Sequence, residues 1–414
     1  MKLAILTQNY IPEPDPKMHV LASGLVKRGH TVTVLTGFPN YPSGTIYSGY
    51  RQTLWTKQVI DGVDVVRMPL YPDRSRSTIR RSLNYLSFAT VASLFGPWHC
   101  PDIEALFVYH PPVTLGVPAY LISLLRRAPF VCEIQDMWPE TLAATKMVSE
   151  GAIIRALTRL ASFTYRKAAA ITVISPGFKR NLIEKGVPEE KIHVIFNWAY
   201  EGAFEPVARD ASFGAKAGLA DRFNVLYAGN MGPAQGLENV IRAATLLADV
   251  PDAQFVLMGS GIDQPRLSEE AGRLGLRNVR FIERQPMERM PHYYAWADAV
   301  MIHLTDDPLF AITVPGKTQS ALASGRPVLA CVAGDAADLI LSARAGLAVP
   351  PCDPAALAGA VRTLRAMPLN ERERMGRAGR RFYDERLAPA TAIGTYESLL
   401  NRVIENHNSN GKCH

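Results

Sequence analysis

Glycines and a lysine in the second half of the sequence could together hold a diphosphate. Gly229-Asn230-Met231-Gly232 follows the apolar run NVLYA and precedes a stretch with helical spacing. Glycines at a strand-to-helix turn let backbone N–H groups approach an anion at the helix N-terminus. Val314-Pro315-Gly316-Lys317-Thr318 opens another helix, where Lys317 could add a positive charge. The spacing is not that of a P-loop, and an ordinary tight turn or a capped helix with a solvated lysine would give the same pattern.

Polar residues also follow the apolar runs of the first half, among them Gln8-Asn9, His110 and Gln135-Asp136. Open parallel sheets bind ligands outside the carboxyl ends of their strands, so these residues are candidates for chemistry. Asp136 could equally cap the helix that begins near Trp138, and His110 could be a hydrogen-bonded structural residue. The sequence has no H-E-x-x-H and no Cys/His cluster, so we expect neither a metal site nor a cofactor.

Short apolar runs alternate with longer amphipathic segments along the whole chain. The strand candidates are LAIL, TVTVLT, VDVVRM, EALFVY, FVCEI, AAITVI, IHVIF, NVLYAG, AQFVLM, NVRFI, AVMIHL and PVLACV. Most of them are continuous apolar runs, which is typical of parallel strands buried on both faces. The segments 17–28, 152–168, 236–248 and 354–366 have helical spacing. This alternation predicts βαβ units.

Residues 198–222 show no clear period and separate two such series. We therefore predict an α/β fold of two Rossmann-like domains whose parallel sheets face each other across a cleft. The first domain is residues 1–200, completed by a helix at about 385–405, and the second is residues 201–384. A chain of 414 residues is long enough for two cores.

Composition narrows the class of protein. The five cysteines show no C-x-x-C spacing, which argues against a disulfide framework and for a reducing compartment. The first residues do not show a basic region, an apolar stretch and a cleavage site in series, so we expect no signal peptide, and the absence of a run of ~18 apolar residues predicts no spanning helix. The net charge of +7 is not gathered in a dense Lys/Arg tract, so nucleic acid is the least favoured anionic partner. Segment 77–98 carries Arg80-Arg81 and then turns apolar, which fits a buried core helix or a helix lying in a membrane surface.

Four stretches carry a resemblance to a known family: GHTVTVLTGFPNYP (29–42), QDMWPE (135–140), AGNMGPAQGL (228–237) and TVPGKTQSALASGRPV (313–328). In content and order they resemble glycosyltransferase family 4 of the GT-B fold. The likeness is greatest to the WbuB/WcaI-like branch of bacterial O-antigen and exopolysaccharide glycosyltransferases, which includes L-fucosamine transferases. It covers nearly the whole chain.

The resemblance implies retaining transfer of a sugar from a nucleotide-sugar to a polyprenyl-diphosphate-linked saccharide in cell-surface polysaccharide synthesis. The donor is expected to be UDP-linked, with UDP-N-acetyl-L-fucosamine as a candidate, and to lie in the C-terminal domain, while the N-terminal domain holds the acceptor. The nucleotide-sugar is a substrate, so no cofactor is expected. Such an enzyme is expected in the cytoplasm, at the inner face of the bacterial plasma membrane.

The resemblance and the strand-end rule together assign site residues. Catalytic roles are expected for Asp136, His110 and Lys317. Donor binding is expected for Gly229, Asn230, Met231, Gly232, Gln235, Gly236, Gly259, Gly261, Arg266, Arg284, Val314, Pro315, Gly316, Thr318 and Ser320, with the amides of Gly232 and Gly316 on the diphosphate. Acceptor binding is expected for Asn9, Asp15, Lys17, Arg74 and Arg76.

The sequence also departs from the wider family. Ile312 and Ser320 stand where many members carry two glutamates, and Asn230 and Gln235 replace a basic pair. Gln135 replaces a histidine, and Pro12-Glu13-Pro14-Asp15-Pro16 replaces a glycine-rich loop. The missing positive charge would come from Lys317, Arg266 or Arg284.

Two alternatives stay open, the first motivated by the absent glutamate pair and the second by the Rossmann-like domains. One is a non-catalytic GT-B protein that binds nucleotide and serves as a partner subunit. The other is a Rossmann-type epimerase or oxidoreductase, although no G-x-G-x-x-G follows the first strand.

Overall fold

The chain forms two compact units, each described here by itself. The computed structural model describes residues 1–75, 77–138, 140, 151–200 and 202–411. The first unit comprises Met1–Ile174, Phe178–Ile195 and Ala392–His414, and the second comprises Ser175–Gly177 and Phe196–Thr391. The sequence-based boundary was placed after residue 200, whereas the chain passes into the second unit at Phe196 and returns to the first at Ala392.

The first unit is built on an eight-stranded sheet in the order β3-β4-β2-β1-β5-β6-β7-β8. All neighbours pair in parallel except β3, which runs antiparallel to β4. Its strands are β1 (Lys2–Leu6), β2 (Thr31–Gly37), β3 (Thr56–Ile60), β4 (Val63–Met68), β5 (Ala105–His110), β6 (Phe130–Ile134), β7 (Ala170–Val173) and β8 (Ile192–Val194). The strand order reverses between β1 and β5, which is where open α/β sheets bind ligands.

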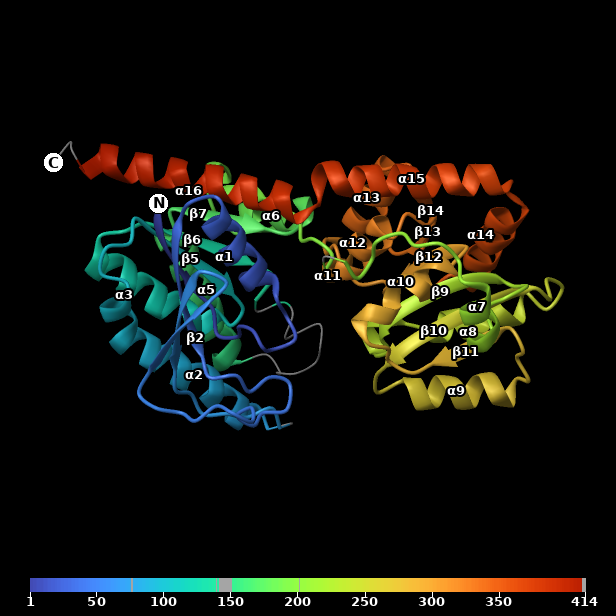
Figure 1. Cartoon of the computed structure of the whole chain (residues 1–414), viewed down its shortest axis with the longest axis horizontal. Helices are drawn as coiled ribbons and strands as arrows, with labels where there is room; N and C mark the ends of the chain where they lie inside the picture. The colour runs from blue at the N-terminus through green and yellow to red at the C-terminus, as the bar shows by residue number, and fades with distance from the viewer. Residues whose placement is uncertain (76, 139, 141–150, 201, 412–414) are drawn as a thin grey trace. The chain divides into compact units, whose positions relative to one another are not determined.

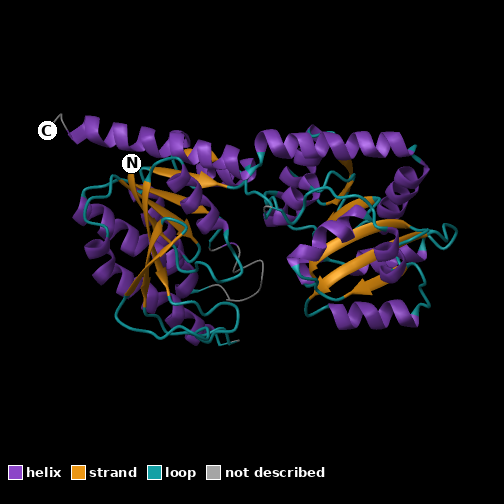
Figure 2. Ribbon diagram, in the orientation of Figure 1, coloured by secondary structure: helices purple, strands orange, loops and turns teal. Residues whose placement is uncertain are grey.

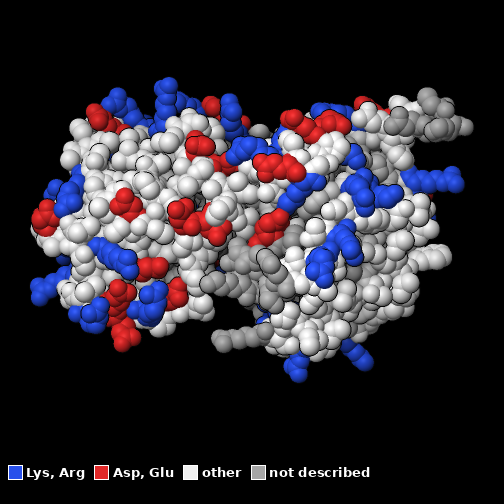
Figure 3. Space-filling view, turned by 180° about the vertical axis from the view of Figure 1, so that it is seen from behind, with Lys and Arg blue, Asp and Glu red and all other residues white. Residues whose placement is uncertain are grey.

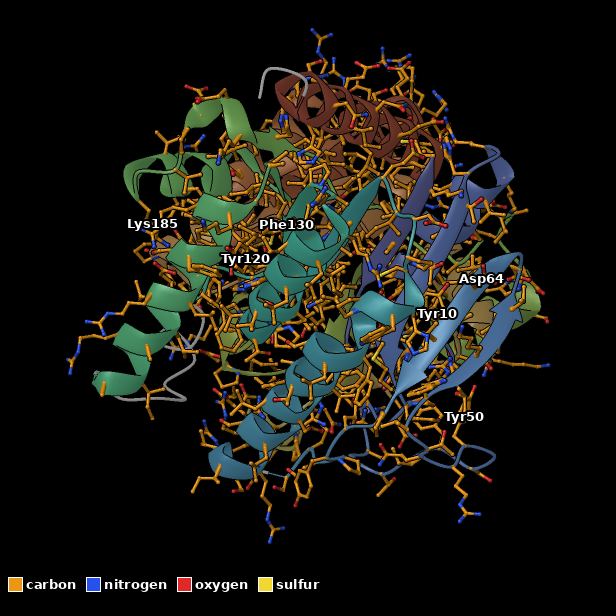
Figure 4. All side chains as sticks on the ribbon, turned by 90° about the vertical axis from the view of Figure 1, so that its left-hand side faces the viewer. Tyr10, Tyr50, Asp64, Tyr120, Phe130 and Lys185 are labelled. Atoms are coloured by element: carbon orange, nitrogen blue, oxygen red, sulfur yellow. The ribbon has the colours of Figure 1, made fainter. Side chains whose placement is uncertain are left out.

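Helices cover both faces of this sheet (Figures 1 and 2). They are α1 (Lys17–Lys27), α2 (Thr78–Phe95), α3 (Gly116–Arg126), α5 (Ala152–Lys167), α6 (Pro176–Glu184) and the greater part of α16 (Pro389–Gly411). The helix α3 packs against β5 and β6, and Figure 4 labels Tyr120 on this helix beside Phe130 of β6.

The C-terminal helix α16 is an integral part of the first unit. The hydroxyl of Tyr396 donates to Glu133 Oε1 over 2.6 Å at the end of β6. Arg28 Nη1 lies 2.7 Å from Glu397 Oε2, and His407 donates to the carbonyl of Arg127. These bonds explain why a segment that follows the second unit in sequence completes the first one.

The second unit contains a six-stranded parallel sheet in the order β11-β10-β9-β12-β13-β14. Its strands are β9 (Phe223–Asn230), β10 (Ala253–Ser260), β11 (Val279–Ile282), β12 (Ala299–His303), β13 (Val328–Cys331) and β14 (Gly346–Val349). Alternate side chains enter two apolar clusters on opposite faces, with Leu226 in one and Val225 in the other. The strand order reverses between β9 and β12, which places the expected ligand position at the ends of these strands.

The helices of the second unit flank its sheet on both faces (Figure 2). They are α7 (Ala211–Ala217), α8 (Glu238–Thr245), α9 (Gln264–Arg273), α10 (Met290–Ala295), α11 (Pro308–Ala311), α12 (Gly316–Ala323), α13 (Asp335–Ser342), α14 (Pro354–Ala366) and α15 (Leu369–Arg386). The α/β prediction is thus confirmed for each unit, while the facing of the two sheets across a cleft stays a prediction.

Charged side chains are mixed over the surface. On the face shown in Figure 3, Lys and Arg lie in small groups with Asp and Glu among them. The charge of +7 therefore does not form one positive tract on this face. Within the described residues, no helix has both the length and the apolar character that a membrane crossing needs.

Candidate functional site

Close backbone approach brings the ends of β9 and β10 together in the second unit. A Cβ on Gly229 would lie 2.3 Å from Lys317 Cε, so any side chain there would displace the lysine stem. A Cβ on Gly259 would lie 1.9 Å from the carbonyl oxygen of Gly229, and both glycines have positive φ, +143° and +147°. The two glycines therefore let Lys317 lie against the turn that follows β9.

Lys317 is a partly buried cation in the first turn of α12, with its ammonium 4.4 Å from the centre of the Tyr227 ring. Its ammonium donates to the hydroxyl of Tyr227, which in turn donates to the carbonyl of Asn230 over 2.5 Å. Burial lowers the pKa of Lys317 to about 8, so the side chain is still mostly charged at neutral pH. Within the described part of the chain no carboxylate forms an ion pair with it. A buried charge without a counter-ion is costly, and a bound anion would relieve that cost.

The turn after β9 uses two of its own amides internally. Gln235 Oε1 accepts from the amide of Gly232 over 3.1 Å and from Asn230 Nδ2 over 3.0 Å. The amide of Met231 donates to the carbonyl of Ser260. The Gly232 N–H is thus donated to Gln235 in this structure, and its expected role on a diphosphate stays a prediction. Lys317 brings a positive charge to the same turn through its bond to Tyr227.

His303 fixes this turn as a hydrogen-bonded structural residue, one of the two roles that a histidine at the end of a buried strand can have. Its Nδ1 lies 2.7 Å from the carbonyl oxygen of Gln235, and its Nε2 lies 2.9 Å from Asn239 Nδ2. A carbonyl only accepts, so Nδ1 carries the proton and Nε2 accepts from Asn239. Burial lowers the pKa of His303 to about 4, which keeps the ring in this neutral form. The position of His303 at the end of β12 was the available signal.

The remaining predicted donor residues lie around the same strand ends or farther out. Arg266 stands in the first turn of α9 and forms ion pairs of 3.6 to 4.0 Å with Glu238, Asp263 and Glu270. Arg284 is exposed in the loop after β11. Ser320 donates to the carbonyl of Gly316, and the buried Thr318 Oγ1 has no partner among the described residues. Gly236, Gly261, Val314 and Pro315 complete the turns that flank Lys317. The donor role of all of them stays a prediction.

A cavity of about 390 Å³ opens at the carboxyl ends of β1 and β5 in the first unit. It is lined by Thr7, Gln8, Asn9, Glu13, Asp15, Met18, Tyr41, Arg74, Arg81, Tyr85, Tyr109, Pro111, Pro112, Asp136 and Trp138. Its volume is that of a small-molecule site, for which ~300–1,000 Å³ is usual. The cavity brings together four of the predicted residues, Asn9, Asp15, Arg74 and Asp136.

Carboxylates, arginines and aromatic rings share the lining of this cavity. Burial raises the pKa of Asp136, which therefore holds its proton more tightly than a surface aspartate. The guanidinium of Arg74 lies 4.4 Å from the centre of the Tyr41 ring and donates weakly to Tyr85 Oη. Aromatic faces beside carboxylates are suited to polyhydroxylated ligands, which present both apolar faces and hydroxyl donors.

Glu13 holds two walls of the cavity together. Its Oε1 accepts from the amides of Asn40 and Tyr41 over 2.8 Å, and its Oε2 accepts from the amide of Tyr10 over 2.9 Å. Behind it, the fully buried Arg67 donates to the carbonyls of Ile11 and Gly37. The proline-rich stretch 12–16 is therefore anchored through Ile11 and Glu13.

Lys17, predicted to bind the acceptor, has a different role. Its Nζ lies 2.6 Å from Glu133 Oε1, and its side chain is only 9% exposed. Glu133 Oε1 also accepts from Gln135 and Tyr396. The lysine does not line the cavity, so the prediction is corrected: Lys17 neutralises a buried carboxylate at the base of the segment that carries Asp136.

His110 ends β5 and is fully buried. Burial lowers its pKa to about 4, and neither ring nitrogen has a hydrogen-bond partner among the described residues. It lies behind the cavity lining and is not part of it. Its catalytic role stays a prediction, and Arg76 lies outside the described residues.

Four aromatic residues of the lining, Tyr41, Tyr85, Tyr109 and Trp138, were not assigned to a site from the sequence. Tyr41 and Trp138 lie in the quoted motifs and could have been found there. Tyr85 and Arg81 lie in the segment interpreted as a core or membrane helix, so no signal linked them to a site.

Two parallel α/β units, each with polar or cationic groups at its switch point, define the GT-B class of glycosyltransferases. Residues 16–198 match the family model of a glycosyl transferase 4-like domain, and residues 222–366 match that of glycosyl transferases group 1. The chain is therefore a glycosyltransferase with the GT-B fold.

Individual relatives agree with this class. The putative colanic acid biosynthesis glycosyl transferase WcaI of Escherichia coli K12 is 29% identical over 344 residues, which span 78% of this chain and 82% of that protein. The probable glycosyltransferase WbjE of Pseudomonas aeruginosa is 29% identical over 58% of this chain and 62% of its own length. The crystal structure of Anabaena HepE in complex with UDP superposes with a TM-score of 0.72 at 18% identity, covering 97% of this chain and all of that one.

Proposed function

We propose that this glycosyltransferase transfers a sugar, with retention of configuration, from a UDP-sugar to a polyprenyl-diphosphate-linked saccharide. The observation that carries the proposal is the partly buried ammonium of Lys317 at the glycine turn after β9, for which the described residues offer no carboxylate partner. A nucleoside diphosphate would supply the missing negative charge. HepE, which shares the fold, was solved with UDP, and the name of WcaI refers to colanic acid biosynthesis.

Lys317 would act most strongly on the leaving diphosphate. Negative charge grows on the diphosphate as the bond to the sugar breaks, and a preorganised cation stabilises that charge. An oxygen of the departing diphosphate would take the proton of the attacking hydroxyl on the same face of the sugar. The new bond would then form on the face that the leaving group vacates, which gives retention.

The acceptor saccharide would occupy the cavity of the first unit. Asp15 and Asp136 would accept hydrogen bonds from its hydroxyls, and the tyrosines would pack against its apolar faces. Asp136 is our choice for the polar group beside the reacting sugar. The sugar moved is proposed to be an acetamido sugar such as N-acetyl-L-fucosamine, on the family resemblance alone. Mass spectrometry of the nucleotide-sugars retained by the purified protein would identify it.

A polyprenyl-linked acceptor lies in a membrane, so the enzyme would have to bind at the membrane surface. The exposed side of α2 is a candidate for that contact. Its inner side buries Phe88, Ala89 and Ala92, while Ile79, Leu83, Leu86, Leu94 and Trp98 of α2 and the next turn are exposed. Arg80 and Arg81 stand at the same helix start. We propose that this face lies in the headgroups of the inner leaflet. Equal recovery in the supernatant with and without anionic vesicles would contradict this part of the proposal.

The central test is UDP release on mixing UDP-sugars with undecaprenyl-diphosphate-linked monosaccharides. We expect Lys317→Ala to lower kcat by roughly 10²–10³-fold, the usual effect of removing one stabilising group. Lys216→Ala, which removes an exposed lysine of α7, is the matched control and should keep full activity. Undiminished turnover in Lys317→Ala would refute its role, and UDP binding without turnover of any donor would favour the non-catalytic alternative.

A further inference from the structure

Gln8 is a buried amide at the floor of the cavity in the first unit. It follows β1 directly, lines the cavity and is only 2% exposed. Its backbone carbonyl accepts from Thr36 Oγ1 and from the amide of Gly37, both over 3.1 Å. The backbone of Gln8 is therefore held against the end of β2, and its side chain has little freedom.

The orientation of the Gln8 amide follows from a chain of bonds that starts at a backbone carbonyl. The carbonyl of Tyr71 can only accept, so the group of Asn84 that lies 2.7 Å from it is the Nδ2 donor. Asn84 Oδ1 must then face Gln8, and it accepts from Gln8 Nε2 over 2.6 Å. Gln8 Oε1 is the end of this chain, and it has no partner among the described residues.

We propose that Gln8 is a specificity-determining residue, whose Oε1 accepts a hydrogen bond from one hydroxyl or N–H of the acceptor saccharide. This inference rests on the proposed role of the cavity as the acceptor site. A buried carbonyl left without a donor costs about 1–3 kcal/mol, so a ligand that supplies the donor is favoured. A ligand without that donor leaves the carbonyl unpaired and is rejected.

The bond to Asn84 ensures that Gln8 presents Oε1, and not Nε2, to the ligand. Turning the Gln8 amide over would offer Nε2 to the ligand, but it would set Oε1 against Asn84 Oδ1 and lose the bond of 2.6 Å. The site is thus fixed as an acceptor at this position. The neighbouring Asn9 Oδ1 is also buried without a partner, so the floor of the cavity carries two acceptors side by side in sequence.

The test compares sugars that differ only in one hydroxyl. Methyl glycosides of glucose, galactose, N-acetylglucosamine and N-acetylgalactosamine are ranked by ligand-observed NMR on the full chain. The best binder is then tested as a series in which one hydroxyl at a time is replaced by fluorine, which cannot donate. We expect one position of this series to bind the wild type about tenfold more weakly, which corresponds to ~1.4 kcal/mol.

Two variants separate recognition from structure. Gln8→Met keeps the length of the side chain and should bind the hydroxyl and fluoro sugars equally well. Asn84→Leu frees Nε2, lets the amide turn over and should reduce the preference for the hydroxyl. Gln254→Met is the matched control, because Gln254 is a buried glutamine of the second unit that bonds Asn224 and Gly218. It should keep the wild-type preference even if it lowers stability.

The outcomes distinguish this inference from the function on which it rests. A wild-type preference that survives in Gln8→Met would overturn the role of Gln8 and leave the acceptor cavity in place. Binding of UDP with no binding of any of the four glycosides would instead overturn the acceptor role of the cavity.

Discussion

The two candidate sites are built in opposite ways. The site in the second unit depends on one partly buried cation, Lys317, set against glycines whose lack of a side chain lets it approach. The cavity in the first unit is wide and mixed in charge, and its lining comes from segments between residues 7 and 138. A diphosphate offers charge and little shape, whereas a saccharide offers shape and many weak hydrogen bonds. We infer that each unit is matched to the chemistry of one substrate.

The largest predicted effect that tests this difference between the two sites is that of replacing Lys317 on the free energy of unfolding. A lysine whose pKa is lowered in the folded state binds fewer protons there than in the unfolded chain between pH 8 and the usual 10.5. The contribution of Lys317 to the free energy of unfolding therefore rises with pH in that window. Below pH 8 the folded protein bears the whole cost of keeping the charged ammonium away from water. Lys317→Met should stabilise the protein at pH 7 by about 3 kcal/mol, while lowering kcat as strongly as Lys317→Ala does.

Urea unfolding at pH 7 and at pH 10 measures this gain, which should shrink at the higher pH. Lys216→Met, on the exposed face of α7, should change stability by less than about 0.5 kcal/mol. A loss of stability in Lys317→Met would mean that the ammonium is compensated within the fold and does not await an anion.

The next largest predicted effect is that of adding a side chain at Gly229, where the Lys317 stem now lies. Gly229→Ala would drive its Cβ into the Lys317 stem, at a φ of +147° that side chains rarely adopt. We expect UDP affinity to fall by roughly 30-fold, about 2 kcal/mol, in calorimetry. Gly275→Ala is the control, because Gly275 also has positive φ, +65°, but its Cβ would meet nothing within 4 Å. Equal losses in the two variants would show that backbone strain alone, and not contact with the lysine, is responsible.

The charge of Lys317 also predicts that UDP affinity depends on pH. In the free enzyme the side chain loses its proton as pH rises through about 8. UDP affinity should therefore fall about tenfold per pH unit above that value, and calorimetry between pH 6.5 and 9.5 would show it. Lys317→Arg keeps the charge at these pH values and should flatten this dependence, even if the larger head group weakens binding overall.

Periodicity in the sequence predicted most of the fold. Segments 17–28 and 354–366 became α1 and α14 because their apolar spacing follows a helix, and the continuous apolar runs became central strands. Two strands were missed, β3 and β14, which lie at the sheet edges. β3 has the sequence TKQVI, with three polar residues and one exposed face, and β14 is only Gly346–Val349, so neither resembles a buried apolar run.

The candidate sites were predictable to different degrees for a physical reason. Gly229 and Lys317 lie in short motifs whose local geometry implies their chemistry. The cavity is assembled by topology, and a residue such as Tyr85 on α2 reaches it only because that helix starts at the carboxyl edge of the sheet. The sequence could not predict that Lys17 pairs with Glu133 or that the Gly232 amide donates to Gln235. Both contacts depend on side-chain positions that only the structure gives.

The smallest predicted effect tests whether the cavity binds the acceptor through many weak contacts. Arg74 packs over the Tyr41 ring at 4.4 Å, an interaction of about 1 kcal/mol, and its Nε has no partner among the described residues. Arg74→Leu should raise the KM for the lipid-linked acceptor about fivefold and leave UDP affinity unchanged. Lys57→Leu, on the exposed side of the edge strand β3, is a control that should change neither constant. A loss of 100-fold or more would mean that the acceptor diphosphate is bound by Arg74 alone, and the cavity would then resemble the site in the second unit more closely than its shape suggests.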